Sequence, residues 1–120
     1  MPAHTVRYLR WNDVPLEQVN EAMARRLVSG EREMVAQVTM KKGCVVPQHA
    51  HESEQITYVL KGALRFRIHG EEFVVGENEL VHIPSHVPHA AFALEETLEL
   101  DIFSPIRQDW LDKTDDYLRR

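Results

Sequence analysis

The most informative stretch of the chain is GCVVPQHAHESEQITYVLKG, residues 43–62. It holds two histidines at spacing two, His49 and His51, followed by Gln55, and a glycine stands at each end. On an extended strand, residues at spacing two point to the same side, so the two imidazoles can bind one ion together. The amide oxygen of Gln55 and a third imidazole, from His89, would complete a mixed nitrogen and oxygen site for a borderline divalent metal.

Short segments of strand character surround this stretch. Apolar side chains alternate along residues 34–40, and turns at Gly30, Gly62 and Gly70 separate neighbouring segments. Many short strands with few helical stretches are typical of an antiparallel sandwich or barrel. The predicted strands cover residues 25–28, 33–40, 55–60, 63–69, 72–75, 79–83, 89–94 and 97–103.

Both ends of the chain carry weaker, helical patterns. Asn12 or Asp13 can act as an N-cap and Pro15 suits a first turn, so residues 13–22 are predicted to form a short helix or turn. Residues 107–120 are predicted to form a short tail helix that packs over one end of the barrel. Its apolar residues are Trp110, Leu111, Tyr117 and Leu118.

The composition fits one globular domain. A chain of 120 residues with 43% hydrophobic content supports a single domain over residues 1–120, with a barrel core at about residues 25–106. No apolar run approaches the roughly 20 residues of a membrane helix, and the N-terminus lacks the pattern of a secretion signal. The single cysteine, Cys44, cannot form an internal disulfide, which agrees with a reducing compartment. We therefore expect a cytoplasmic protein that does not bind membranes.

The charge pattern argues against nucleic acid as a partner. The net charge is -5 with neutral histidines, and apart from the Arg119-Arg120 end the basic residues are scattered along the chain. A nucleic-acid-binding protein would usually show a basic stripe.

The strand at residues 97–103 has one polar face. Leu98, Leu100 and Ile102 fall on one side, and Thr97, Glu99, Asp101 and Phe103 fall on the other. Acids and an aromatic ring on one face suit either a solvent-exposed surface or a ligand-lined lumen, and the alternation alone does not choose between them.

The motif of residues 43–62, together with the downstream Pro84-x4-His89, resembles the two motifs of the cupin superfamily. In that pattern the first motif supplies two histidines and a glutamate, and the second supplies a final histidine. Here Gln55 stands at the glutamate position, and His86 stands where a glycine is usual. The resemblance spans roughly residues 33–106. It implies an all-β fold, the double-stranded β-helix or jelly-roll barrel of a small single-domain cupin, and it implies a homodimer.

A narrower resemblance is to the pectin-degradation cupins, which linearise unsaturated uronate monosaccharides into open-chain keto acids. It rests on the ligand pattern and on the ending from Asp101 to Leu111, although in those proteins the gap between the second histidine and the glutamine is typically one residue longer. By this resemblance His49, His51, Gln55 and His89 are metal ligands, Asp101 and Arg107 are catalytic residues, and Phe103 and Arg107 contact substrate. Tyr58 lies on a strand that can line the cavity and is predicted as a further substrate contact.

An uncharged ligand set would affect how strongly the metal polarises a bound substrate. Three neutral imidazoles and an amide leave the metal's full charge in place, which makes it a strong Lewis acid toward a bound carboxylate or carbonyl. Zinc, nickel, manganese or iron would suit these ligands. The leading hypothesis is a metal-dependent enzyme that opens unsaturated uronates from pectin or alginate breakdown, and so acts on a small carboxylated substrate. The alternatives are an oxygen-dependent, dioxygenase-like metal cupin and a non-catalytic module that binds a sugar acid or a metal.

Each candidate residue also has a purely structural interpretation. Asp101 suits an exposed strand position, Arg107 a surface ion pair with Asp109, and Phe103 a core position. Cys44 is predicted to be a small core residue and Trp110 to pack the tail onto the barrel. The remaining histidines His69, His82 and His86 are predicted to be structural or exposed.

Overall fold

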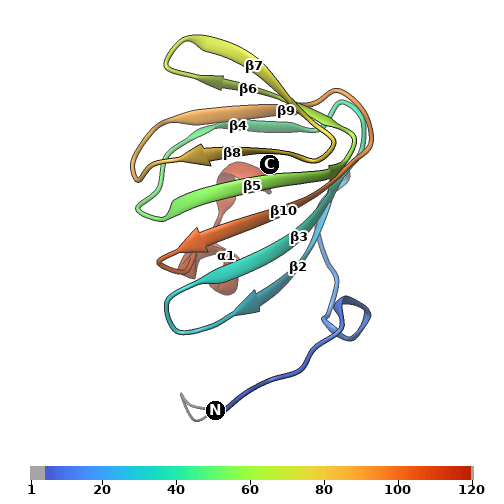
Figure 1. Cartoon of the computed structure of the whole chain (residues 1–120), viewed down its shortest axis with the longest axis vertical. Coiled ribbons are helices and arrows are strands. Elements are labelled where there is room, and N and C mark those ends of the chain that lie inside the picture. The colour runs from blue at the N-terminus through green and yellow to red at the C-terminus, as the bar shows by residue number, and fades with distance from the viewer. Residues whose placement is uncertain (1–4, 120) are drawn as a thin grey trace.

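The computed structural model describes residues 5–119. These residues form two antiparallel sheets that face each other (Figure 1). One sheet has the strand order β1-β2-β3-β10-β5-β8, and the other has the order β4-β9-β6-β7. This confirms the antiparallel all-β architecture that the strand pattern predicts and the jelly roll that the resemblance implies. The strands are β1 (Glu17–Asn20), β2 (Met23–Ser29), β3 (Met34–Met40), β4 (Val45–His49), β5 (Glu54–Lys61), β6 (Ala63–Ile68), β7 (Glu71–Gly76), β8 (Glu79–Ile83), β9 (His89–Ala93) and β10 (Thr97–Ser104).

The core lies between the sheets and follows from the alternation in the sequence. Along β3 the side chains of Met34, Ala36, Val38 and Met40 are buried, while the residues between them are more exposed. On the opposite sheet, Leu64 and Phe66 of β6 point into the same core. Period-two burial of this kind places one face of each strand inside and the other outside.

Gly62 shows why the first motif ends on glycine. Its φ is +95°, a left-handed conformation that other residues rarely adopt, and a Cβ there would lie 2.6 Å from Thr97 Oγ1. The turn between β5 and β6 therefore sits directly on the start of β10, and a side chain at position 62 would push the two apart.

The polar face of β10 points inward. Thr97, Glu99, Asp101 and Phe103 are buried, whereas Leu98, Leu100 and Ile102 are half-buried or exposed on the outside. The alternation alone did not show whether this face meets solvent or lines a lumen. The tertiary structure places it in the lumen, with two acids and an aromatic ring.

The predicted helix or turn at residues 13–22 is wrong over most of its length. A single 3-10 turn, η1 (Trp11–Asp13), is followed by the strand β1, which pairs with β2. Val19 of β1 is buried in the core. Pairing with a neighbouring strand and burial of this valine outweigh the weak local capping signal, because tertiary contacts override propensity over such short segments.

The tail prediction is confirmed as two short helices, α1 (Gln108–Asp112) and η2 (Asp116–Leu118). Trp110 and Leu118 are buried in the core, and η2 lies against β4. The prediction also placed His49 and His51 together on an extended strand, but β4 ends at His49 and His51 lies in the loop that follows. None of the helices within residues 5–119 is long and apolar enough to cross a membrane.

Candidate metal centre

Three histidines from two strands and a loop converge at one end of the lumen. His49 ends β4, His51 follows it, and His89 begins β9 directly opposite His49 in the strand pairing. One ring nitrogen from each residue can be chosen so that all three lie within 4.8 Å of one another. The side chains that the sequence motifs single out as ligands are therefore brought together by the fold.

Backbone carbonyls fix the tautomer and the orientation of the three imidazole rings. The Nδ1 atoms of His49, His51 and His89 lie 2.9, 2.8 and 2.8 Å from the carbonyl oxygens of Pro47, Ser53 and Val87, each two residues away. Because a carbonyl can only accept, Nδ1 carries the hydrogen in each neutral ring and Nε2 keeps a free lone pair. This outer support is the arrangement that orients imidazoles for a metal.

Gln55 completes the group through its side-chain oxygen. Its Nε2 donates to Thr57 Oγ1 at 2.8 Å, which turns Oε1 toward His51 Nε2 at 3.0 Å. With Nδ1 protonated, Nε2 of neutral His51 has no hydrogen, so two lone pairs face each other at this short distance. A cation bound by both atoms would relieve the repulsion between them.

His89 gives the clearest test of whether a metal fits. Its side chain is 2% exposed, and Nε2 finds no hydrogen-bond partner among residues 5–119. A buried ring nitrogen without a partner costs free energy, and a metal ion would satisfy it. The four donors, three imidazole nitrogens and one amide oxygen, suit a borderline divalent ion such as zinc, nickel, manganese or iron.

The protonation state of the histidines also favours a metal. Burial, together with the neighbouring His89, lowers the pKa of His49 to about 3. Burial, together with Arg107, lowers the pKa of His51 to about 4, and burial lowers the pKa of His89. All three rings are neutral near pH 7, so a metal would not have to displace protons from them.

Replacing His89 with alanine is expected to abolish stable metal binding. The loss should exceed the roughly 10- to 100-fold that removal of an outer-shell partner costs, because a ligand atom itself disappears. Elemental analysis of the dialysed protein would measure it. His82→Ala is the matched control, since His82 is exposed on β8 and bonds to Glu54 at 2.6 Å away from the lumen. Equal metal content in the two variants would contradict the assignment.

The metal-free protein is expected to lose stability as the pH falls below the ordinary histidine value of 6.5. The unfolded chain takes up protons there, whereas folded His49 and His51 stay neutral until about pH 3 and about pH 4. The contribution of these histidines to the unfolding free energy is therefore fully present above pH 6.5 and declines as the pH falls from 6.5 to about 3. Urea unfolding with a chelator present would measure it. The His49→Phe variant should show a weaker decline, and a decline as steep as the wild type's would contradict this account.

Asp101 lies beside the metal ligands at the end of a hydrogen-bonded chain. Thr57 Oγ1 accepts from Gln55 and donates to Asp101 Oδ1 at 2.6 Å, and Gln55 Nε2 approaches the same oxygen at 3.5 Å. Burial raises the pKa of Asp101, although the bond from Thr57 and the charge of Arg107 oppose the shift. Glu99, two residues earlier on the same face, is also buried, and burial together with the charge of Asp101 raises its pKa further.

Arg107 is both paired and directed into the lumen. Its Nε and Nη2 donate to the two carboxylate oxygens of Asp109 at 3.0 and 2.8 Å, and Nη2 also donates to the Tyr117 hydroxyl at 2.9 Å. Burial opposes the charge of Arg107, but the bonds to Asp109 and Tyr117 outweigh it and raise its pKa. The third nitrogen, Nη1, is buried without a partner among residues 5–119. The guanidinium thus keeps one donor free for a ligand.

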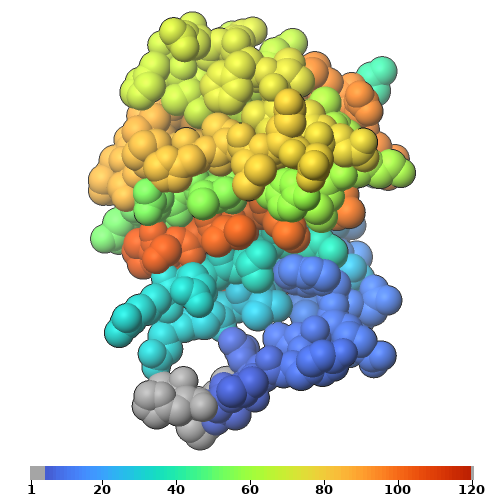
Figure 2. Space-filling model, viewed as in Figure 1, coloured from blue at the N-terminus to red at the C-terminus, as the bar shows by residue number. Residues whose placement is uncertain are grey.

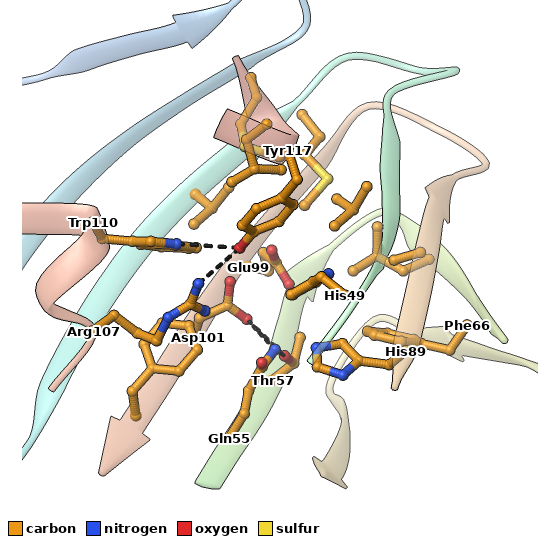
Figure 3. Close-up of a pocket in the computed structure, with 18 residues that line it drawn as sticks. His49, Gln55, Thr57, Phe66, His89, Glu99, Asp101, Arg107, Trp110 and Tyr117 are labelled. Atoms are coloured by element: carbon orange, nitrogen blue, oxygen red, sulfur yellow. Dashed lines mark hydrogen bonds between the residues drawn. The ribbon is translucent and has the colours of Figure 1, made fainter. Parts of the chain in front are cut away.

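Aromatic rings and the tail close the pocket. Phe103 is 1% exposed and packs edge-on against Trp110, with ring centres 5.0 Å apart. Tyr117 of η2 stacks on His49 at 4.3 Å, and its hydroxyl lies between Trp110 and Arg107 (Figure 3). The space among these residues has a volume of about 40 Å³. Phe103 therefore serves as core and pocket wall at once, and Trp110 packs the tail while also lining the pocket.

Three pocket residues have no functional role in the sequence prediction. Thr57 and Glu99 share the inward faces of β5 and β10 with Gln55 and Asp101, so spacing two from those residues was the available signal. Tyr117 comes from the tail, and only the packing of η2 against β4 brings it to His49.

Tyr58 lies away from this group. It stands between the inward residues Thr57 and Val59 on β5, and its hydroxyl donates to Asn78 Oδ1 at 2.6 Å in an exposed setting. The prediction that Tyr58 contacts substrate is corrected accordingly, because alternation along β5 turns its side chain outward. His69, His82 and His86 are exposed and Cys44 is buried, as predicted. His86 adopts φ +65°, which explains why a glycine is usual there, and its N–H donates to the His51 carbonyl.

Comparison with known proteins gives one family match and several similar structures. The cupin domain family matches residues 36–104. Oxalate decarboxylase OxdC of Bacillus subtilis is 32% identical over 84 residues, which are 66% of this chain but only 22% of that enzyme. One of its structures, at 24% identity and TM-score 0.75 over 88% of this chain and 32% of that one, concerns its Mn(II) centres.

Two solved structures match along most of their length. KdgF from Halomonas sp. is 29% identical, with a TM-score of 0.81 over 87% of this chain and 99% of that chain. An RmlC-like cupin from Shewanella frigidimarina is 23% identical, with a TM-score of 0.82 over 88% and 96%, and it supports the fold alone. Because the family match covers more than half of the chain, this protein belongs to the cupin family.

Proposed function

We propose that this cupin opens the ring of unsaturated uronate monosaccharides in a metal-dependent isomerisation that yields an open-chain keto acid. The sequence resemblance to the pectin-degradation cupins and the structural likeness to KdgF support this substrate class. His49, His51, Gln55 and His89 would hold the metal, which would supply Lewis-acid polarisation of bound substrate oxygens.

One observation carries the proposal. The cavity is lined by two buried groups that each have an atom without a partner among residues 5–119, His89 Nε2 and Arg107 Nη1. The first is a lone pair that suits a metal, and the second is a cationic N–H that suits a carboxylate. The Asp101 carboxyl lines the same cavity. A small carboxylic acid could place its carboxylate on Arg107 Nη1 and a second oxygen on a metal held by His89. The bond next to that second oxygen would then lie near Asp101.

The chain's own residues can account for the proton movements. Arg107 would hold the substrate carboxylate through Nη1, while Asp109 and Tyr117 keep the guanidinium in place. Asp101 would take the proton from the C1 hydroxyl as the bond between C1 and the ring oxygen breaks. C1 then becomes an aldehyde and the ring oxygen an enol, and protonation at C4 with loss of the enol proton completes the ketone. No proton is gained or lost overall, so one residue that exchanges protons is sufficient.

Glutamine rather than glutamate at position 55 fits this chemistry. The amide donates to Thr57 and approaches Asp101 as a donor, which a carboxylate could not do. A glutamate would place a second negative charge beside Asp101 and would also offset the charge of the metal.

The size of the cavity sets a condition on substrate entry. A volume of about 40 Å³ is far below the roughly 300–1,000 Å³ of typical small-molecule sites, so a monosaccharide requires the Tyr117 side chain and the η2 turn to move aside. Tyr117 stacks on His49 in the place where this opening would occur.

The test is turnover of unsaturated galacturonate or mannuronate, followed as loss of the absorbance of the conjugated alkene. We expect acceleration by the metal-loaded protein and loss of activity after chelation, with recovery when metal is returned. Because these sugars also open slowly without a catalyst, the comparison is with the same solution and free metal. No acceleration over that blank by protein with one metal per chain would refute the proposal.

A second candidate follows from the same cavity volume and from the identity to oxalate decarboxylase. The space suits a smaller carboxylate than a uronate, and such a ligand would not require the tail to open. Incubating the metal-loaded protein with oxalate under air and following carbon dioxide release would distinguish the two, since only this candidate predicts gas evolution.

A further inference from the structure

Arg107 presents its guanidinium to the lumen in a fixed orientation. The side chain is 4% exposed, and the guanidinium carbon lies 5.1 Å from the centre of the Phe103 ring and 5.1 Å from the centre of the Trp110 ring. Asp109 accepts from Nε and Nη2, at 3.0 and 2.8 Å, and so occupies one edge of the planar group. These contacts hold the guanidinium without help from a ligand.

The second edge of the guanidinium is only half occupied. Nη2 carries two hydrogens, one on the edge that it shares with Nε and one on the edge that it shares with Nη1. Asp109 takes the first, and the second is donated to the Tyr117 hydroxyl at 2.9 Å (Figure 3). On the same edge, Nη1 is buried without a partner among residues 5–119. An edge that could bind both oxygens of a carboxylate is therefore held at one position by Tyr117 and open at the other.

The Tyr117 hydroxyl is a weaker partner for this edge than a carboxylate would be. It is neutral, so it attracts the guanidinium less than an anionic oxygen does, and it fills one donor position of two. Trp110 Nε1 also donates to the hydroxyl, but at 3.3 Å, which is longer than the roughly 2.7–3.2 Å of ordinary bonds of this type. A carboxylate that bonds to Nη1 and Nη2 together would have to take the place of the hydroxyl.

Displacement of the hydroxyl would also uncover a metal ligand. The Tyr117 ring stacks on His49, with ring centres 4.3 Å apart and planes 22° from parallel. One side chain thus contacts the carboxylate-binding group through its hydroxyl and a histidine of the metal centre through its ring. Asp115, two residues earlier, is bonded to buried Arg25 at 2.7 Å, so the tail stays attached to the barrel when Tyr117 moves.

The larger sheet gives a ligand no other way in. Figure 2 shows its outer face, on which β3, β10 and β5 lie against one another and close the lumen. With Tyr117 in place, the space inside has a volume of about 40 Å³. A uronate therefore does not fit in the lumen together with the Tyr117 ring in this position.

We propose that Tyr117 competes with the ligand's carboxylate for Arg107. The hydroxyl occupies the Nη2 position until a carboxylate takes both Nη1 and Nη2, and the ring then leaves His49. Binding of an acid at Arg107 is thereby coupled to access at the metal ligands. A neutral sugar has no group that replaces the hydroxyl, so it leaves the ring in place. This inference rests on the proposed function only for the carboxylate at Arg107, and it extends to uronates that do not react.

The first measurement follows the Tyr117 ring directly by NMR. The probes are galacturonate, which lacks the alkene and so cannot react, and galactose, its neutral counterpart. The protein is loaded with zinc, which is diamagnetic, and its three tyrosines carry an isotope label in the ring. Tyr8 and Tyr58 lie outside the lumen and serve as internal references. We expect galacturonate to shift the Tyr117 signals in a saturable manner and galactose to leave all three tyrosines unchanged.

Tyr117→Phe tests the hydroxyl itself. Phenylalanine keeps a ring over His49 but makes no bond to Arg107, so galacturonate no longer has to displace one. The dissociation constant for galacturonate should fall about tenfold, the equivalent of one hydrogen bond to a charged group. Tyr58→Phe is the matched control, because it removes a hydroxyl that bonds to Asn78 at 2.6 Å outside the lumen, and it should leave the constant unchanged. Titration calorimetry measures both variants, and circular dichroism verifies that they fold.

The proposal would be overturned by galacturonate binding that leaves the Tyr117 signals unmoved, or by galactose shifting them as galacturonate does. It would also be overturned if Tyr117→Phe bound galacturonate no more tightly than the wild type, since the hydroxyl would then not compete. Absence of saturable galacturonate binding to either protein would show that this edge of Arg107 is not a carboxylate site. If the binding results are as expected but unsaturated uronates are not turned over, the proposed function fails and the competition by Tyr117 stands.

Discussion

Asp101→Asn is expected to lower the turnover of an unsaturated uronate by about 10²- to 10⁴-fold, the usual range for loss of a general acid or base. Asparagine keeps the shape of aspartate and an oxygen that can accept the Thr57 bond, which is 2.6 Å long in the native protein. It cannot take up and return a proton. The change therefore removes proton transfer with little effect on packing, and the measurement is the rate per metal-loaded chain.

The controls separate chemistry from metal loss and misfolding. Metal content should match the wild type, because the three histidines and Gln55 are untouched. Glu31→Gln, an exposed acid in the turn before β3, should keep the wild-type rate. An Asp101→Asn variant with full metal and full activity would show that Asp101 does not transfer the proton, and a metal-free variant would show that its role is to support the ligands.

Arg25→Met is expected to cost about 3–5 kcal/mol of unfolding free energy, the range for breaking a buried ion pair from one side. The Arg25 side chain is fully buried, with Nη1 2.7 Å from Asp115 and Nε 3.0 Å from Glu17. Its guanidinium also lies 4.2 Å from the centre of the Trp110 ring. Methionine fills a similar volume but leaves the Asp115 carboxylate buried without this partner.

Arg119 provides the matched comparison for this prediction. It pairs with the same two acids, at 2.8 Å to Asp115 and 2.6 Å to Glu17, but its side chain is 23% exposed. Arg119→Met should therefore cost much less, within the roughly 0–1 kcal/mol of more exposed pairs. Urea unfolding of both variants measures the difference. Equal losses would contradict the view that burial of Arg25 decides the effect.

The Arg25 cluster also connects stability with the pocket. It ties β1 and β2 to the tail through Asp115, two residues before Tyr117, which stacks on His49. Loss of Arg25 should loosen η2 as well as lower stability. The Tyr117 contact over the histidines is then the part of the site that changes first.

Much of the fold and part of the site were accessible from sequence because they depend on local spacing. Period-two alternation and glycine turns located most of the strands, and the motif spacing singled out the three histidines whose ring nitrogens the fold brings within 4.8 Å. The capping signal at residues 12–15 misled the prediction for residues 13–22, where pairing with β2 decided the outcome. Alternation from Gln55 already puts Tyr58 on the opposite face of the strand, a signal that the prediction of a substrate contact did not use.

The motif, the strand periodicity and the grouping of Glu99, Asp101 and Phe103 on one face can be read from local spacing alone. That this face is the lumen, that Tyr117 covers His49 and that Arg25 is buried against Asp115, 90 residues away, follows from the packing of distant segments. The physical reason is the range of the interactions. Backbone geometry repeats every two residues and is visible in a short window, whereas burial and ion pairing depend on which distant segments pack together.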